Sequence, residues 1–425
     1  MEQVVSNVTF ADVVHPSLSF SREIPSEALL LELIDNRWMQ RLREIVQTAN
    51  ARLLYMFSEH SRFGHSLGVA YLASQLLRRL ETDYPERVKP YRLAVSAAAL
   101  LHDIGHLSPG SHTAFKVWFP GGKDAHEELA ARIICEDSEL HALLENSRRG
   151  LAAEVCAVLA ESPDLPAWTW EIISGGGWNV DRGNWCIADS VMAGVNYGKY
   201  NIPALTESIL LSPDGHLALK ENRLDAMMHF AVSRHAMYSQ IYQHRVLLAA
   251  DALSAAIAKR ARFLGEKLGF ADHTMQQALH AGSVRDLTLE SVFWMRESWW
   301  RYHVLRWSDN GDAILSDLCR RLINRRLFKT VKVSAEDCRD LQQRAETAVR
   351  ACGLDPEYYL HRISAADVHA GDQKHSMPVM LDDGRLCPVH EVDPLFNALF
   401  DENRAARSAW LALPEEAKLR LGLRR

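Results

Sequence analysis

Apolar residues recur every three or four positions through most of this 425-residue chain, which is the spacing of one buried helix face. The pattern begins at Ser26 and is densest in the leucine and alanine stripe of residues 65–80. Gly175-Gly176-Gly177 interrupts it, and a further helical segment follows. The spacing predicts helices over 26–45, 65–80, 91–101, 125–145, 150–161, 182–193 and 224–268.

Short strands are expected before, between and after these helices. Residues 1–25 alternate loosely between apolar and polar, and residues 209–219 form a hairpin pattern around Ser212-Pro213-Asp214-Gly215. A helix at 338–352 and short strands at 358–363 and 378–389 follow. We therefore predict a mainly α protein with small β-hairpins. Residues 1–330 form one domain with its core at about 40–260, and residues 331–425 form a small α+β lobe packed on that core.

A His-Asp pair stands where the apolar segment 93–101 ends. His102 and Asp103 precede Gly105, and adjacent residues on a helix point about 100° apart, so the two cannot share one narrow core face. Both can reach a divalent metal bound at the helix end, since imidazole and carboxylate are common metal ligands. The alternative is a capping aspartate beside a half-buried histidine.

Two other stretches carry matching chemistry. His65 stands at the start of the leucine-striped helix, three residues after Arg62. Asp181, Trp185 and Asp189 are spaced four apart and share one helix face, with Arg182 beside it. The alternative for Asp181 is a helix N-cap. His65, His102, Asp103 and Asp181 together form a mixed nitrogen and oxygen set that suits Fe, Mn, Zn, Co or Ni and leaves coordination positions for water and a phosphate oxygen.

Composition limits the class of protein. A formal charge of −6 gives no basic field for nonspecific nucleic-acid binding. No apolar run is long enough to span a bilayer, and the N-terminus has no signal-peptide pattern. The seven cysteines form no C-x-x-C pair, which is typical of free thiols in a reducing compartment. We expect a cytoplasmic protein. The tryptophan-rich segment 293–307 is expected to be core and to supply buried surface to a homo-oligomer.

These motifs resemble the HD superfamily of metal-dependent phosphohydrolases. Within it, the chain resembles the deoxynucleoside triphosphate (dNTP) triphosphohydrolases, the group that includes the human sterile-alpha-motif HD enzyme and bacterial dGTPases. The resemblance extends from about Asp12 to about Glu402. It includes the segments 40–47, 62–69, 102–106, the helix of Asp181, 242–245 and 325–329.

The resemblance implies a role for each of several side chains. The metal ligands would be His65, His102, Asp103 and Asp181. The phosphates would be held by Arg62, Arg182 and Arg234. The sugar and base would contact Gln47, Trp185, Asp189, Tyr242 and Gln243. The leaving oxygen would receive a proton from His112, with His106 and His126 assisting.

The implied reaction is attack of metal-activated water on the α-phosphorus, which releases a deoxynucleoside and intact tripolyphosphate. Mg²⁺ on the triphosphate, an activating nucleotide, a homo-oligomer and a role in antiviral defence are further implications. Residues 12–15 resemble a segment that binds the activator in some relatives, although Pro16 replaces the usual glycine.

Two departures from the family pattern keep other functions open. Trp185 replaces a tyrosine that packs under the deoxyribose, and Phe115 replaces an acidic residue that follows the general acid. Proton relay through that acidic residue would then be lost, or would pass to Asp124, Glu127 or Glu128. The chain could instead hydrolyse another phosphoester, such as a nucleoside monophosphate, a ribonucleotide or a signalling nucleotide. A nucleotide-binding sensor with decayed catalysis is the third hypothesis, but the intact ligand set argues against it.

Overall fold

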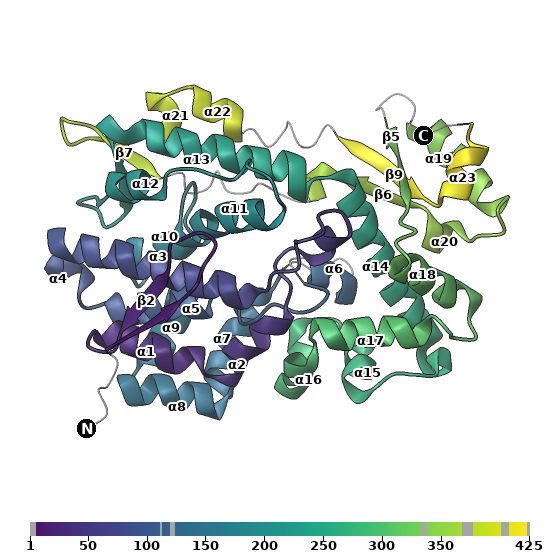
Figure 1. Ribbon diagram of the computed structural model, residues 1–425, viewed down its shortest axis with the longest axis horizontal. Helices are drawn as coiled ribbons and strands as arrows, with labels where there is room; N and C mark the ends of the chain where they lie inside the picture. The colour runs from purple at the N-terminus through teal and green to yellow at the C-terminus, as the bar shows by residue number, and fades with distance from the viewer. Residues whose placement is uncertain are drawn as a thin grey trace.

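The computed structural model describes residues 6–110, 113–119, 124–333, 338–367, 377–400 and 408–422 (Figure 1). Helices dominate it, which confirms the mainly α prediction.

The secondary structure is as follows. The first half contains β1 (Asn7–Phe10), β2 (Leu18–Ser21), α1 (Pro25–Ile34), α2 (Arg37–Arg41), α3 (Arg62–Asp83), α4 (Pro85–Val88), α5 (Arg92–Leu101), α6 (Thr113–Trp118), α7 (His126–Glu136), α8 (Ser138–Ser147), α9 (Leu151–Leu159), α10 (Trp168–Ser174) and α11 (Val180–Met192). The middle contains α12 (Ile202–Ser208), β3 (Ile209–Leu211), β4 (Leu217–Lys220), α13 (Leu224–Met237), α14 (Arg245–Leu264), α15 (His273–His280), α16 (Leu289–Trp294), α17 (Glu297–Trp307) and α18 (Ala313–Ile323). The remainder contains β5 (Lys329–Val333), α19 (Cys338–Arg350), α20 (Pro356–Tyr359), β6 (His361–Ser364), β7 (Pro378–Met380), β8 (Leu386–Pro388), α21 (Val389–Val392), α22 (Leu395–Phe400), β9 (Ala409–Leu413) and α23 (Glu415–Arg420).

Helix α5 lies at the centre of the N-terminal half. Every residue from Ala94 to Leu101 is buried, because α1, α3 and α9 all pack against it (Figure 1). A helix surrounded by others needs no polar face, which explains its unbroken alanine and leucine run. Helix α11 packs on the other side of α3. The ends of α5, α3 and α11 are therefore held close together by core packing.

The predicted helix over 224–268 is not continuous, and this part of the prediction is wrong. Helix α13 ends at Met237 and passes into a π-helical turn, Tyr238–Tyr242. His244 then adopts an extended conformation (φ −66°, ψ 123°), and its ring accepts a hydrogen bond from the backbone of Val246 at the start of α14. Hydrophobic spacing does not detect a single π turn, because the apolar stripe resumes in nearly the same register. The interruption directs Tyr242 towards α11.

The predicted helix over 26–45 is also divided, because Asn36 adopts an extended conformation and its side chain caps α2. The predicted helix over 125–145 is divided as well. Asp137 leaves the helical region (φ −77°, ψ 112°), and its carboxylate accepts a hydrogen bond from the Leu140 N–H at 2.9 Å. Its other oxygen pairs with Arg37 at 2.5 Å. The N-cap and the ion pair together turn the chain between α7 and α8.

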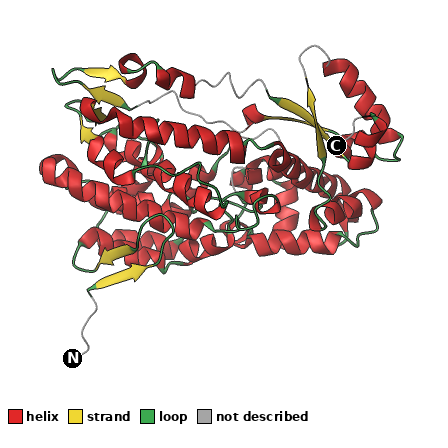
Figure 2. Cartoon of the chain, turned by 45° about the horizontal axis from the view of Figure 1, so that its top comes forward, coloured by secondary structure: helices red, strands yellow, loops and turns green. Residues whose placement is uncertain are grey.

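Three small sheets lie at the margins of the helical body (Figure 2). Strands β1 and β2 pair with each other, which confirms the strands expected near the N-terminus. The hairpin of β3 and β4 is also confirmed, and β7 and β8 extend its sheet through a parallel pairing of β4 with β7. The third sheet has the order β5-β9-β6. Strands β7 and β8 lie beyond residue 330 but join the sheet of β3 and β4, which lie before it. The domain boundary near residue 330 therefore stays a prediction.

The tryptophan-rich segment is core only in part. Trp300 and Trp307 are buried, whereas Trp294 is 49% exposed at the end of α16. None of the described helices is both long and apolar enough to cross a membrane.

Candidate functional site

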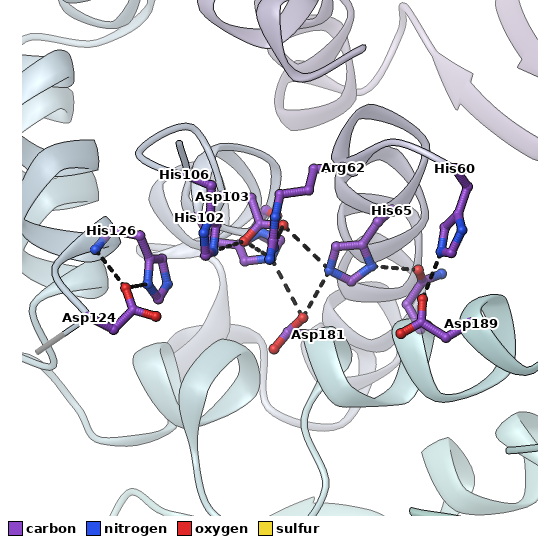
Figure 3. A network of polar contacts seen from close by, with 12 residues as sticks. His60, Arg62, His65, His102, Asp103, His106, Asp124, His126, Asp181 and Asp189 are labelled. Atoms are coloured by element: carbon purple, nitrogen blue, oxygen red, sulfur yellow. Dashed lines mark hydrogen bonds and ion pairs between the residues drawn. The ribbon is translucent and has the colours of Figure 1, made fainter. Parts of the chain in front are cut away.

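His65, His102 and Asp181 converge from three helices (Figure 3). His65 lies in the first turn of α3, His102 directly follows α5, and Asp181 lies in the first turn of α11. Their ligand atoms all lie within 4.8 Å of one another. The Asp181 Oδ1 atom is 2.9 Å from Nε2 of His65 and 3.6 Å from Nε2 of His102.

Asp103 adjoins this group from the loop after α5. Its Oδ1 lies 3.4 Å from Nε2 of His102, and its Oδ2 lies 3.7 Å from Nε2 of His65. The structure thus brings together the four side chains that the sequence pattern selected. Their identity as metal ligands stays a proposal.

The capping alternatives do not hold. The N-cap of α11 is Asn179, whose side-chain oxygen accepts a hydrogen bond from the Arg182 N–H at 2.8 Å. Asp103 accepts a hydrogen bond from Nη1 of Arg62 at 2.6 Å. Neither Asp103 nor Asp181 caps a helix, so helix capping does not explain their position at two buried helix ends.

The charges of this group depend on one another. Burial of His102 opposes its protonation, but the carboxylates of Asp103 and Asp181 outweigh this effect and raise its pKa to about 9. Burial raises the pKa of Asp181, but the adjacent His102 and His65 imidazoles outweigh it and hold that pKa far below its ordinary value. Two carboxylates thus attract positive charge to one small volume.

This donor set fits a divalent metal. Nε2 of His102 is buried and makes no hydrogen bond to any described residue, although two carboxylate oxygens lie near it. A cation among the four side chains would accept the lone pair of this nitrogen. It would take the place of the proton that the carboxylates otherwise favour on His102. Two imidazoles with two carboxylates suit first-row transition metals, and the ligands alone do not select one of them.

Asn184 fixes the orientation of His65. Its Oδ1 accepts a hydrogen bond from Nδ1 of His65 at 2.9 Å, so Nε2 is the nitrogen that faces the metal group. Gly68, one turn after His65, leaves the room for Asn184, since a Cβ there would lie 2.2 Å from its Nδ2 atom. No sequence motif selects Asn184. Its only signal is its place one helical turn after Asp181.

A second group of possible ligands lies beside the first. Asp103, His106 and His126 also place their ligand atoms within 4.8 Å of one another. The rings of His106 and His126 stack with centroids 4.1 Å apart, and Nε2 of His106 lies 3.2 Å from Oδ1 of Asp103. Gly105 permits this arrangement, because a Cβ there would lie 1.9 Å from the backbone oxygen of His126.

Asp124 supplies a carboxylate to His126. Nδ1 of His126 donates to Oδ1 of Asp124 at 2.8 Å, and this interaction outweighs burial and raises the pKa of His126. Burial, the Arg62 charge and His126 together hold the pKa of His106 well below its usual value. Phe115 is fully buried near His106. His112 lies outside the described residues.

Comparisons with known proteins agree with this geometry. A family model described as "HD domain" matches residues 62–168. The Bacillus subtilis protein YwfO is 31% identical over 362 residues, which is 84% of this chain and 81% of YwfO. The chain belongs to the HD superfamily of phosphohydrolases.

Other relatives are more distant. Zebrafish SAMHD1, named a deoxynucleoside triphosphate triphosphohydrolase, is 26% identical over 250 residues, or 51% of this chain and 40% of that protein. The chain therefore spans less than half the length of this relative. The crystal structure of a phosphohydrolase from Bacteroides thetaiotaomicron has a TM-score of 0.79 at 21% identity, covering 96% of this chain and all of that one. This likeness shows the shared fold.

A cluster of aromatic rings lies further along α11, around Asp189. Oδ1 of Asp189 accepts a hydrogen bond from Nε2 of His60 at 2.7 Å, and its Oδ2 accepts one from the Tyr242 hydroxyl. The Trp185 ring lies edge-on to Tyr242 and Tyr238, with centroids 5.4 Å and 5.9 Å away. No sequence motif selects His60, but its side chain is only 14% exposed and its ring is hydrogen-bonded to Asp189.

The remaining selected residues lie in three places: beside Asp103, near the start of α11, and beside His60 and the aromatic cluster. Arg62 is buried on Asp103, and Nη1 of Arg182 donates to the backbone oxygen of Gly175 at 2.8 Å. Arg234 is buried, with its guanidinium carbon 5.1 Å from the Tyr238 ring centroid. Gln47 is buried beside His60, whose backbone oxygen accepts its N–H. Gln243 follows the π turn.

Proposed function

We propose that this HD protein hydrolyses deoxynucleoside triphosphates to a deoxynucleoside and tripolyphosphate. One observation supports this most directly. Helix α11 carries Asp181, a carboxylate of the candidate metal group (His65, His102, Asp103 and Asp181), and two turns later Asp189, a carboxylate that contacts the aromatic cluster. A rise of 1.5 Å per residue separates them by about 12 Å along the axis. One ligand can thus contact the metal group with a phosphate and Asp189 with its sugar.

The aromatic cluster would hold the sugar. Asp189 is buried and receives a hydrogen bond on each oxygen, so its carboxylate has a fixed position. A carboxylate held in this way can accept the 3′-hydroxyl hydrogen through a remaining lone pair. Gln47 would bind the same hydroxyl, because its buried Oε1 has no hydrogen-bond partner in the described structure. Trp185 would pack against the sugar face, with Tyr242 and Gln243 beside it.

Arginines and histidines would act on the triphosphate. The guanidinium groups of Arg62, Arg182 and Arg234 would neutralise and orient the phosphates. His126, whose Nδ1–H is held by Asp124, and His106 would handle protons beside the α-phosphate together with His112. Proton relay would thus pass through Asp124 rather than through position 115, where the side chain is apolar.

His65, His102, Asp103 and Asp181 would hold the metal. A divalent ion there supplies a Lewis acid that neutralises phosphate charge and lowers the pKa of water. Asn184 would keep Nε2 of His65 directed towards the ion, and Arg62 would keep Asp103 in place.

A second candidate is hydrolysis of a different nucleotide, such as a ribonucleotide, a monophosphate or a signalling nucleotide. Trp185 favours it, because its bicyclic ring changes the shape of the surface against which the sugar packs. A nucleotide-binding sensor without catalysis is disfavoured, because all four candidate ligands are present and lie close together.

A product-resolved nucleotide panel tests the proposal. Purified protein with Mn²⁺ is incubated with each dNTP, each ribonucleoside triphosphate and each deoxynucleoside monophosphate. We expect deoxynucleoside and tripolyphosphate from dNTPs. Pyrophosphate or orthophosphate as the sole inorganic product would refute the reaction, and faster turnover of ribonucleotides or monophosphates would favour the second candidate.

A matched pair of variants assigns the activity to this site. Asp181→Asn keeps the side-chain shape but removes the charge, and turnover should fall at least 100-fold. Asp164→Asn makes the same change at an exposed carboxylate outside the site and should leave turnover unchanged. Equal rates in the two variants would show that the metal group is not the catalytic site.

Assembly and activation are further parts of the proposal. Met56 and Phe57 are 78% and 68% exposed, which suits a contact between copies of the chain. Adding a second nucleotide to the same panel tests activation, and light scattering at each condition measures the oligomer.

A further inference from the structure

Two free cysteines meet where α7 packs on α9 (Figure 1). Cys135 is the penultimate residue of α7, and Cys156 lies in the middle of α9. Their sulfur atoms are 3.7 Å apart although the residues are 21 positions apart in the chain. Cys135 is exposed and Cys156 is partly buried.

This geometry is close to that of a crosslink. A disulfide has a sulfur–sulfur distance near 2.05 Å, so the two atoms need only about 1.7 Å of approach. Rotation of the two side chains can supply much of that movement without moving either helix. The two helices already pack against each other, so the fold has brought the two cysteines together before any crosslink forms.

We propose that Cys135 and Cys156 are a site of reversible oxidation at which an intramolecular disulfide joins α7 to α9. The oxidant is a low-molecular-weight disulfide. The Cys135 thiolate attacks one of its sulfur atoms, forms a mixed disulfide and releases one thiolate. The Cys156 thiolate then attacks the Cys135 sulfur, forms the protein disulfide and releases the second thiolate. The two cysteine protons go to the released thiolates, and two electrons pass from the protein to the oxidant.

The two cysteines have different roles in this sequence of steps. Cys135 is accessible to the oxidant from solvent, whereas Cys156 is shielded. Burial, and then the neighbouring Cys135, raise the pKa of Cys156 to about 12, so its thiolate is scarce at neutral pH. Cys135 is therefore the residue that attacks first. Cys156 resolves the mixed disulfide because its sulfur is already in contact.

The crosslink would constrain helix α7, whose first residue, His126, lies close to Asp103 and His106. Helix α7 begins at His126, nine residues before Cys135, and α9 packs against α5, whose end carries His102. Nine residues of helix span about 13 Å, so the disulfide would fix the orientation of α7 without touching the site. It would also close the segment that contains α8, which restricts the unfolded chain and stabilises the fold.

Oxidation of the folded, reduced wild-type protein with glutathione disulfide tests this. Peptide mapping without reductant should show a crosslinked pair of peptides containing Cys135 and Cys156, and the titratable thiols should fall by two. Dithiothreitol should reverse both changes. The oxidised protein should unfold at a Tm at least about 2 °C above that of the reduced protein.

Matched variants identify the order of attack. In Cys156→Ser, Cys135 should accumulate as a stable mixed disulfide with glutathione, whereas Cys135→Ser should form neither product. Cys387→Ser removes a cysteine of intermediate exposure elsewhere and should crosslink as the wild type does. The proposal would be overturned if the wild-type protein stopped at the mixed disulfide or crosslinked only between chains. It would also be overturned if the oxidised protein had the same Tm as the reduced protein.

Discussion

Gly68 and Gly64 lie one turn apart on α3 and offer a direct test of the metal group. An alanine at Gly68 would place its Cβ 2.2 Å from Nδ2 and 2.9 Å from Cγ of Asn184. Such contacts do not occur in folded proteins, so the Asn184 side chain must move. Because Asn184 is buried and holds His65, its movement breaks the hydrogen bond to Nδ1 of His65. An alanine at Gly64 meets nothing within 4 Å.

The magnitudes follow from opposing effects. Replacing glycine with alanine inside a helix stabilises it by about 1 kcal/mol. At position 68 the clash costs about 1–3 kcal/mol, and the lost hydrogen bond costs about 1 kcal/mol more. Gly68→Ala should therefore lower the free energy of unfolding by about 1–3 kcal/mol, whereas Gly64→Ala should raise it slightly. Loss of the partner that orients a metal-binding histidine should weaken metal affinity by about 10–100-fold at position 68 only.

Urea unfolding measures the stability change, and calorimetric titration with Mn²⁺ measures the affinity. Asn184→Ala and the double variant complete a cycle, because a clash that acts through Asn184 cannot add to the loss of Asn184. The double variant should bind metal no more weakly than Asn184→Ala. Additive losses, or equal affinities in Gly68→Ala and Gly64→Ala, would refute the role of Asn184 in orienting His65.

Three further predictions concern other contacts. Replacing His60 with leucine removes a hydrogen bond to the Asp189 carboxylate, so kcat/KM should fall at least tenfold for dNTPs and little for 2′,3′-dideoxynucleotides; equal losses would contradict a role through the sugar. Burial raises the pKa of Asp137, but hydrogen bonds from Leu140 and Arg37 outweigh it and lower that pKa. The carboxylate's contribution to the free energy of unfolding is therefore complete above the unfolded pKa of about 3.9 and is lost as the pH falls further. Asp137→Ala should therefore destabilise by about 1–2 kcal/mol at pH 7 in urea unfolding, and the difference should shrink below about pH 4. Metal at about 100 times its Kd should raise the free energy of unfolding by about 2.7 kcal/mol, and a chelator should abolish this gain; a Tm indifferent to chelation would contradict metal binding in the folded state.

Several features of the site could be predicted because they depend on neighbours in the chain. His102 and Asp103 are adjacent, and Asp181 and Asp189 share a helix face through their spacing, so their local arrangement follows from helical geometry. The apolar spacing likewise predicted most helices. It missed the π turn before Tyr242 and the break at Asp137, because neither changes the average spacing of apolar residues.

The partners of these residues could not be predicted in the same way. His60 reaches Asp189 across 129 positions, and His65 reaches Asn184 across 119. Asn184 lies between two candidate residues on α11, and its orientation towards α3 depends on how those two helices pack. Asp124 was one of three possible carboxylates near His126, and only the loop before α7 decides which of them approaches the ring.

The helical class, the four candidate ligands and the HD superfamily were predictable without coordinates, because helix periodicity and short motifs depend on residues that are close together in the chain. Four contacts became visible only in the folded chain: the nitrogen of His65 that faces the metal group, the carboxylate that binds His126, the hydrogen bond from His60 to Asp189, and the approach of two cysteine sulfurs. These contacts join segments far apart in the chain, and their distances arise from the packing of α3, α5, α7, α9 and α11 rather than from any local preference.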